Sequence, residues 1–270
     1  MSIDFSLILV LATLVTGVVW GGWLAYLRQT GQLGSTAEAR EAGRVPESAN
    51  AIHEPVLVEY ARSFFPVLLI VLVVRSFLYE PFRIPSSSMM PTLLIGDFIF
   101  VNKYEYGLRL PVLNTEIVDL GEPKQGDVVV FRLPADPSVN YIKRLIGMPG
   151  DKITYRNKRL YINDEQVPIE YIGLYETDLG TEVRIARESL EFVEHDLLLM
   201  PYQKSMEGTF MVPEGHYFMM GDNRDNSRDS RYQGVGFIPV ENVVGRAVRI
   251  WMNWDFPGSL QWRRIGRAIE

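Results

Sequence analysis

The sequence contains no cysteine and only three histidines, His53, His195 and His216. Without cysteine the chain cannot be a cysteine protease, bind a metal through thiolates or form disulfides. The histidines are scattered and show no HExxH-like spacing, so neither a catalytic zinc site nor a cofactor is expected. The GxSxG nucleophile elbow and the SxxK pair are also missing, which argues against α/β-hydrolases and penicillin-binding proteins.

Positive charge is scarce as well. Lysine and arginine together number 27 against 33 acidic residues, which gives a formal net charge of −6. There is no basic arm and no motif that combines aromatic and basic residues for RNA binding. We therefore expect no nucleic-acid partner.

Charge is missing altogether from Phe5 to Leu27, and about 20 apolar residues suffice to cross a membrane. Residues 1–4 carry no lysine or arginine, and the run does not end in the small-x-small exit of a cleavable signal peptide. We therefore predict an uncleaved transmembrane helix over residues 1–27. A second apolar run, Ser63 to Tyr79, is interrupted only by Arg75 and predicts a transmembrane helix over residues 63–80. Because this run is short for a span, a buried core helix is the alternative.

The segment between the two runs, residues 28–62, is polar. It carries most of the basic residues near the runs, namely Arg28, Arg40, Arg44 and Arg62. Since basic loops stay in the cytoplasm, we predict a cytoplasmic loop over residues 28–62. Residues 81–270 then form an extracytoplasmic domain.

From Pro81 onward, short β-type runs alternate with glycine, proline, asparagine and aspartate. We expect strands at 98–101, 128–131, 152–155, 217–220 and 243–251, and a hairpin that turns at Asn163-Asp164. Residues of about 152–212 are more polar and irregular, which indicates an inserted subdomain. The expected fold class is mainly β, an antiparallel barrel or sandwich anchored by two N-terminal transmembrane helices.

Three consecutive serines, Ser86 to Ser88, lie soon after the second apolar run in the segment Pro85 to Thr92. A serine-rich turn before a helix is usually only a cap. Here the flanking prolines and methionines fix the backbone beside an apolar surface, close to the expected bilayer. Ser88 is a candidate nucleophile if the chain supplies a base.

Lys143 is the candidate base among the six lysines. It lies between Tyr141-Ile142 and Leu145-Ile146, and on a strand Tyr141, Lys143 and Leu145 share one face. Burial penalises the charged form of an amine and lowers its pKa, which could turn lysine into a base. The alternative is an edge-strand lysine that points into solvent.

The third segment is the charged run from Gly221 to Gly234. Its acidic residues are spaced somewhat like an EF-hand loop, but the arginines and the missing terminal glutamate do not fit calcium. The run could be a solvated loop, or it could hold a lysine amine in place by hydrogen bonds.

Together these segments resemble bacterial type I signal peptidase (leader peptidase), a membrane serine protease with a Ser-Lys dyad. The resemblance covers nearly the whole chain: two N-terminal spans, Pro-Ser-x-Ser-Met-Met-Pro-Thr at 85–92, Gly-Asp-Val-Val-Val-Phe at 126–131, Tyr-Ile-Lys-Arg at 141–144 and Gly-Asp-Asn-Arg-Asp-Asn-Ser-x-Asp-Ser-Arg at 221–231. It implies cleavage of signal peptides from exported pre-proteins after small-x-small motifs. It also implies a multi-pass protein of the bacterial inner membrane, with the catalytic domain on the periplasmic side.

The resemblance assigns roles to individual residues. It implies that Ser88 is the nucleophile, Lys143 the general base and Ser86 a hydroxyl donor of the oxyanion hole. The implied supporting residues are Ser227, which would orient the lysine amine, the ion pair of Asp229 and Arg231, and the packing residue Tyr141. Apolar positions that match the family's shallow substrate pockets are Phe82, Ile84, Met89, Leu93, Ile99, Val130 and Ile142, although each is also an ordinary core residue by composition.

The implied partners are secreted pre-proteins, the lipid bilayer and the secretion translocon. Late aromatic residues could rest on the bilayer or pack in the core: Trp251, Trp254, Phe256 and Trp262. Ser87 stands where the family commonly has glycine, and a positive φ at that position would be costly for serine.

Two other readings compete. A Ser-Lys autoprotease of the repressor-cleaving kind shares the dyad but is soluble, which the two apolar runs contradict. A non-catalytic, membrane-tethered β domain that binds envelope proteins would make Ser88 and Lys143 incidental.

Overall fold

The computed structural model describes residues 5–30, 54–109, 115–118, 120–176, 182–254 and 260–270. The chain divides into two compact units, one of residues 1–78 and 109–117 and the other of residues 79–108 and 118–270. Most of the expected cytoplasmic loop, including His53, lies outside the described residues, and so does Phe256.

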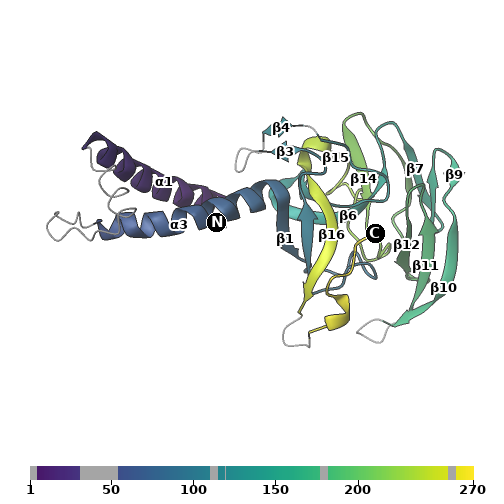
Figure 1. Ribbon diagram of the computed structural model, residues 1–270. Helices are drawn as coiled ribbons and strands as arrows, with labels where there is room; N and C mark the ends of the chain where they lie inside the picture. The colour runs from purple at the N-terminus through teal and green to yellow at the C-terminus, as the bar shows by residue number, and fades with distance from the viewer. Residues whose placement is uncertain (1–4, 31–53, 110–114, 119, 177–181, 255–259) are drawn as a thin grey trace. The chain divides into compact units, whose positions relative to one another are not determined.

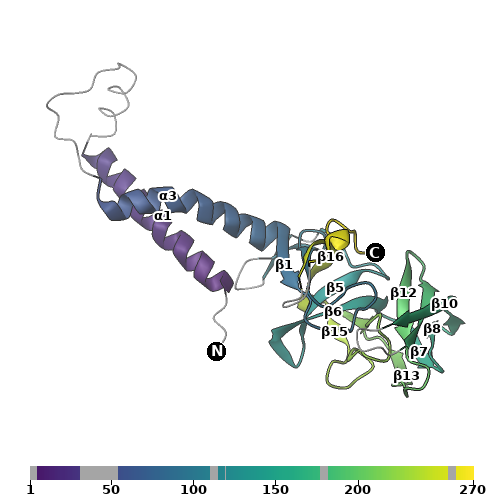
Figure 2. The same ribbon diagram turned by 90° about the horizontal axis from the view of Figure 1, so that it is seen from below.

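The first unit contains helices α1 (Phe5–Gln29) and α3 (Val56–Val73), which lie side by side (Figure 1, Figure 2). The π-helical turn η1 (Val74–Leu78) continues α3. Trp20 and Phe65 pack with ring centroids 5.6 Å apart. Both helices are long and apolar enough to cross a membrane.

The second helix begins before residue 63, because Pro55 can start a helix and its carbonyl accepts the Val58 amide at 2.8 Å. At the other end, Tyr79 and Glu80 already belong to strand β1. The boundaries of the two spans and of the loop between them stay predictions.

The second unit is built on a seven-stranded antiparallel sheet of order β1-β2-β16-β5-β6-β14-β15. Its strands are β1 (Tyr79–Arg83), β2 (Asp97–Asn102), β16 (Val243–Asn253), β5 (Val128–Leu133), β6 (Asp136–Gly147), β14 (His216–Met220) and β15 (Ile238–Pro239). The mainly β, antiparallel fold class is thus confirmed. Four of these strands, β2, β5, β14 and β16, contain the strands expected at 98–101, 128–131, 217–220 and 243–251. Short 3₁₀ turns occur at Val240–Asn242 and Trp262–Arg264.

Strands β7 to β13 lie outside this sheet. They form a four-stranded sheet, β13 (Gly208–Met211), β7 (Lys152–Arg156), β8 (Arg159–Ile162) and β9 (Glu165–Gln166), and a three-stranded sheet, β10 (Ile169–Glu176), β11 (Glu182–Ser189) and β12 (Glu194–Leu199). They belong to the same compact unit as the large sheet, so a separate subdomain at about 152–212 stays a prediction. A two-stranded ribbon joins β3 (Leu108–Arg109) to β4 (Glu116–Val118).

The hairpin turn predicted at Asn163-Asp164 is present between β8 and β9. Both residues have positive φ, 52° and 69°, as a type I′ turn requires. The turn between β7 and β8 has the same character, with φ of 49° at Asn157 and 58° at Lys158. The sequence analysis did not single out this second turn.

Strand β6 occupies an interior position that decides the environment of Lys143. It pairs with β5 on one side and with β14 on the other, with Lys143 opposite Val129. The large sheet carries apolar clusters, and Val129, Phe131 and Leu145 belong to one of them. Lys143 is therefore not an edge-strand lysine.

Candidate active site

Ser88 lies in the connection between β1 and β2, and backbone hydrogen bonds join the two ends of this connection. The Ile84 amide donates a hydrogen bond to the Asp97 carbonyl at 2.8 Å, and the Gly96 amide donates to the Ile84 carbonyl at 3.0 Å. Met89, the residue after Ser88, is fully buried. The backbone around Ser88 is therefore anchored on both sides.

Lys143 reaches Ser88 from the middle of β6. Its Nζ donates hydrogen bonds to Ser88 Oγ at 2.7 Å and to the Ile142 carbonyl at 2.9 Å. The Nζ atom also lies 5.4 Å from the ring centroid of Tyr141. The structure thus brings together Ser88 and Lys143, which are 55 residues apart in the sequence.

The Lys143 side chain is almost entirely removed from water, since only 4% of the residue is exposed. Burial lowers the pKa of the Lys143 amine to about 8, although the carboxylates of Asp229 and Asp222 act in the opposite direction. With that pKa, roughly a tenth of the amine is neutral at pH 7. A neutral amine at hydrogen-bond distance from a serine hydroxyl has the geometry that a general base needs.

Ser86 and Ser87 differ in what they contact. Ser86 Oγ lies 3.4 Å from Ser88 Oγ. Ser87 Oγ accepts a hydrogen bond from Asn226 Nδ2 at 2.9 Å, and its carbonyl accepts one from Asn223 Nδ2 at 3.1 Å. Ser87 is not among the described residues with positive φ, so serine carries no left-handed backbone cost there.

The loop that follows β14 contacts the backbone of Ser88. The Asn223 amide donates to the Ser88 carbonyl at 3.1 Å. A Cβ atom on Gly221 would lie 2.5 Å from the Ser88 carbonyl oxygen and 2.3 Å from Ser227 Oγ, so only glycine fits. Ser227 Oγ is buried and has no hydrogen-bond partner among the described residues, so its orienting role stays a prediction.

Asp229 and Arg231 form the ion pair that the resemblance implied. Arg231 Nε donates to Asp229 Oδ1 and its Nη2 donates to Asp229 Oδ2, both at 2.8 Å. The same carboxylate accepts the Gly221 amide at 3.0 Å, and Arg231 also donates to the Arg224 carbonyl at 2.6 Å. The pair fixes the loop behind Lys143.

Arg144 and Asp222 form a second buried pair that the sequence analysis missed. Arg144 Nε and Nη2 each donate to one oxygen of the Asp222 carboxylate at 2.8 Å. Burial raises the pKa of Asp222, but Arg144 outweighs that effect and holds it below its ordinary value. Thr92 Oγ1 adds a hydrogen bond to the same carboxylate at 2.5 Å.

A third ionic pair joins the loop to the insertion. Arg224 donates to both carboxylate oxygens of Glu188 on β11. His195 on β12 lies between the Arg224–Glu188 and Arg144–Asp222 pairs. Its Nε2 atom is 3.5 Å from a carboxylate oxygen of Glu188 and 3.7 Å from one of Asp222. Burial and the charge of Arg144 hold the pKa of His195 well below its ordinary value, so its imidazole is neutral at neutral pH.

An open cavity of about 870 Å³ adjoins the dyad. The seven apolar residues matched to substrate pockets form one apolar cluster, comprising Ile84, Met89, Leu93, Ile99 and Val130 with Phe82 and Ile142 packed against it. Of the seven, only Ile142 lines the open cavity. The other six do not line it, and the role of all seven as substrate pockets stays a prediction.

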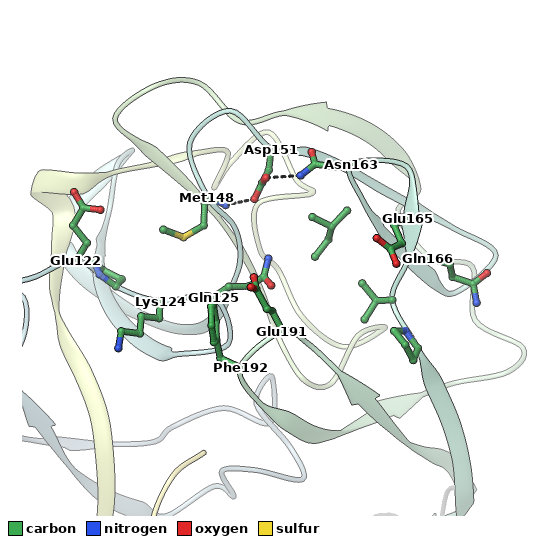
Figure 3. Close-up of a pocket in the computed structure, with 14 residues that line it drawn as sticks. Glu122, Lys124, Gln125, Met148, Asp151, Asn163, Glu165, Gln166, Glu191 and Phe192 are labelled. Carbon is green, nitrogen blue, oxygen red and sulfur yellow. Dashed lines mark hydrogen bonds between the residues drawn. The ribbon is translucent and has the colours of Figure 1, made fainter.

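A second hollow, of about 890 Å³, lies apart from the dyad (Figure 3). Acidic side chains surround it, among them Glu122, Glu165 and Glu191. Asp151 is already occupied, because it accepts hydrogen bonds from the Met148 amide and from Asn163, both at 2.8 Å. Across the described ranges, no group of three or more histidine, aspartate or glutamate side chains could hold a metal ion.

The late tryptophans divide into two kinds. Trp251 packs on Phe98 and Phe100, with ring centroids 5.4 and 5.6 Å apart. Trp254 and Trp262 are exposed to 48% and 73%. Exposed tryptophans are typical of interfaces, and a contact with the bilayer stays a prediction.

Comparison with known proteins gives long matches. A family model described as signal peptidase, peptidase S26, matches residues 57–252. Signal peptidase I of Pseudomonas fluorescens is 46% identical over 95% of each chain, and so is signal peptidase I of Pseudomonas aeruginosa. A solved signal peptidase I from Enterococcus faecalis is 28% identical over 47% of this chain and 97% of that chain, but its TM-score of 0.31 carries no weight for the fold.

These matches run through the segments that hold the dyad. The family model includes both Ser88 and Lys143, and the Pseudomonas relatives cover nearly the whole chain. The family resemblance predicted from the sequence motifs is therefore confirmed, and the chain belongs to the signal peptidase I family, peptidase S26, of serine proteases.

Proposed function

We propose that the chain removes signal peptides from pre-proteins with Ser88 as nucleophile and Lys143 as general base. The observation that carries this proposal is the buried amine of Lys143, which lies 2.7 Å from Ser88 Oγ. Membership in the signal peptidase I family supplies the reaction class and the kind of substrate. It also disfavours the alternative of a non-catalytic binding domain.

The reaction begins with neutral Lys143. Its amine takes the proton of Ser88 as Oγ attacks the carbonyl carbon of the scissile peptide bond. The oxyanion that forms is stabilised by the Ser88 amide and the Ser86 hydroxyl. The lysine ammonium then protonates the leaving amine, and the mature protein departs. Water, deprotonated by the same lysine, hydrolyses the acyl-enzyme and restores Ser88.

The surroundings of the amine favour this role. Each of the two carboxylates that raise the pKa of Lys143 is paired with an arginine, Asp229 with Arg231 and Asp222 with Arg144. The arginine charges offset the negative potential that would otherwise keep the amine protonated. Desolvation then prevails and lowers the pKa of the amine to about 8, so that part of it is neutral and can accept a proton near neutral pH.

Substrate selection, in this proposal, uses the apolar cluster around Ile84, Met89 and Val130. Shallow apolar pockets accept small side chains at the first and third positions before the cut and clash with large ones. The proposed setting is the bacterial inner membrane, with α1 and α3 as spans, residues 28–62 in the cytoplasm and the catalytic unit on the periplasmic side. The lipid bilayer and the secretion translocon are the proposed neighbours.

The test is cleavage of a pre-protein with an Ala-x-Ala junction by the detergent-purified full chain. We expect wild type to cut at the junction and both Ser88→Ala and Lys143→Ala to leave the pre-protein intact. Sequencing the N-terminus of the product identifies the bond that was cut. Equal cleavage by the two variants would rule out the dyad, and no cleavage by wild type would favour the binding domain.

A further inference from the structure

One charged side chain that lines the cavity beside the dyad has no partner in the part of the chain that the structure describes. Apart from the dyad lysine, two charged residues line this cavity, Asp225 and Arg228. Asp225 is engaged elsewhere, with Lys158 at 2.9 Å and Ser205 at 2.5 Å. Among the described residues, Arg228 forms no hydrogen bond or ion pair.

Arg228 is held against the wall of this cavity. A Cβ atom on Gly234 would lie 2.4 Å from Arg228 Nη2, so the guanidinium rests directly on a glycine that leaves room for it. Both residues line the cavity. Arg228 is exposed, and a guanidinium with unused donors is suited to bind a carboxylate.

The position of Arg228 indicates which part of a substrate it would meet. The proposed pockets for the residues before the cut belong to the apolar cluster of Ile84 and Val130, and Arg228 is not part of that cluster. It lies on the loop after β14, which lines the cavity from a different element. Since the proposed pockets would take the residues before the cut, the part of the cavity that Arg228 lines is left for the residues that follow it.

We infer that Arg228 is a specificity-determining residue that favours an acidic side chain within the first three residues of the mature protein. The inference rests on the proposed function, since it requires a substrate bound at Ser88. A solvent-accessible arginine–carboxylate pair changes binding modestly, so we expect about a two- to fivefold preference in kcat/KM. The preference weakens as salt screens the pair.

The experiment uses the detergent-purified full chain and matched pre-proteins that differ only in one residue after the cut. Glutamate, glutamine and lysine are placed in turn at the first, second and third positions. We expect wild type to prefer glutamate over glutamine and glutamine over lysine at one of these positions. Arg228→Gln should remove the order, and Arg228→Glu should reverse it.

The matched control is Arg156→Gln, which removes an exposed arginine on β7 outside the cavity and should keep the wild-type order. Wild type that cuts all substrates equally, or Arg228→Glu that keeps the preference for glutamate, would overturn the inference and leave the proposed function intact. Wild type that cuts none of them would instead refute the proposed function. The two failures are therefore distinguishable.

Discussion

Lys143 and Arg144 are neighbours on β6, but burial affects the charges of their side chains differently. Both are buried, with 4% and 0% of the residue exposed. The lysine amine has only a hydroxyl and a carbonyl as hydrogen-bond partners, whereas Arg144 holds Asp222 through two hydrogen bonds and donates to the Gly126 carbonyl. Burial without a carboxylate partner makes a cation lose its proton; burial with one preserves the ion.

The two faces of β6 thus have different roles, one suited to catalysis and one to holding the structure together. On one face a desolvated amine meets a hydroxyl, an arrangement that suits proton transfer. On the other face an ion pair joins the strand to the loop after β14, the loop that also contacts the Ser88 carbonyl. Arg144 both fixes the position of that loop and offsets the charge of Asp222 near the amine.

The largest expected effect comes from making the two neighbours alike. In Lys143→Arg, the guanidinium cannot release its proton at any pH at which the protein is folded. We expect pre-protein cleavage to fall by about 10⁴-fold or more, as when a residue of a catalytic unit is removed. The measurement is kcat/KM on an Ala-x-Ala pre-protein. Activity within tenfold of wild type would show that Lys143 is not the base.

The second change removes the ion pair of Arg144 with Asp222. Arg144→Gln leaves the Asp222 carboxylate buried without its partner, which should cost about 3–5 kcal/mol in the free energy of unfolding. Thermal or denaturant unfolding of the detergent-solubilised chain measures this loss. The control is Arg187→Gln, which removes an exposed pair with Asp196 and should cost far less, because solvent screens that pair. Equal losses in the two variants would contradict a structural role for Arg144.

Much of this contrast was accessible from the sequence. Tyr141 and Leu145 flank Lys143 at strand spacing, and that pattern indicated a candidate base on an apolar face, with a solvent-facing edge lysine as the alternative. The structure decides for the buried lysine. The hairpin at Asn163-Asp164 was equally predictable, because few residues tolerate positive φ at two consecutive positions.

The partners of the buried charges were not accessible. Arg144 and Asp222 are 78 residues apart, and Glu188 reaches Arg224 from the insertion. Sequence spacing reports which face of a strand a residue occupies, but it does not report which distant carboxylate will meet it. The same limit applies to the pocket residues, because Met89 and Val130 are apolar whether they line a pocket or fill the core.

The smallest expected effect is a shift in pH dependence. Neutral lysine is the active form, so kcat/KM of wild type should rise about tenfold per pH unit below pH 8 and level off above it. In Arg144→Gln the charge of Asp222 is no longer offset. Since this carboxylate raises the pKa of Lys143, the midpoint of the profile should move to higher pH.

Profiles are recorded well below the unfolding temperature of the less stable variant, so that only the folded enzyme is measured. Arg187→Gln should keep the wild-type midpoint, because its charge lies at the surface, where solvent screens it. An unchanged or lowered midpoint in Arg144→Gln would mean that Arg144 does not shield the amine. The two neighbours would then be linked only through the position of the loop, and desolvation alone would account for the lowered pKa of Lys143.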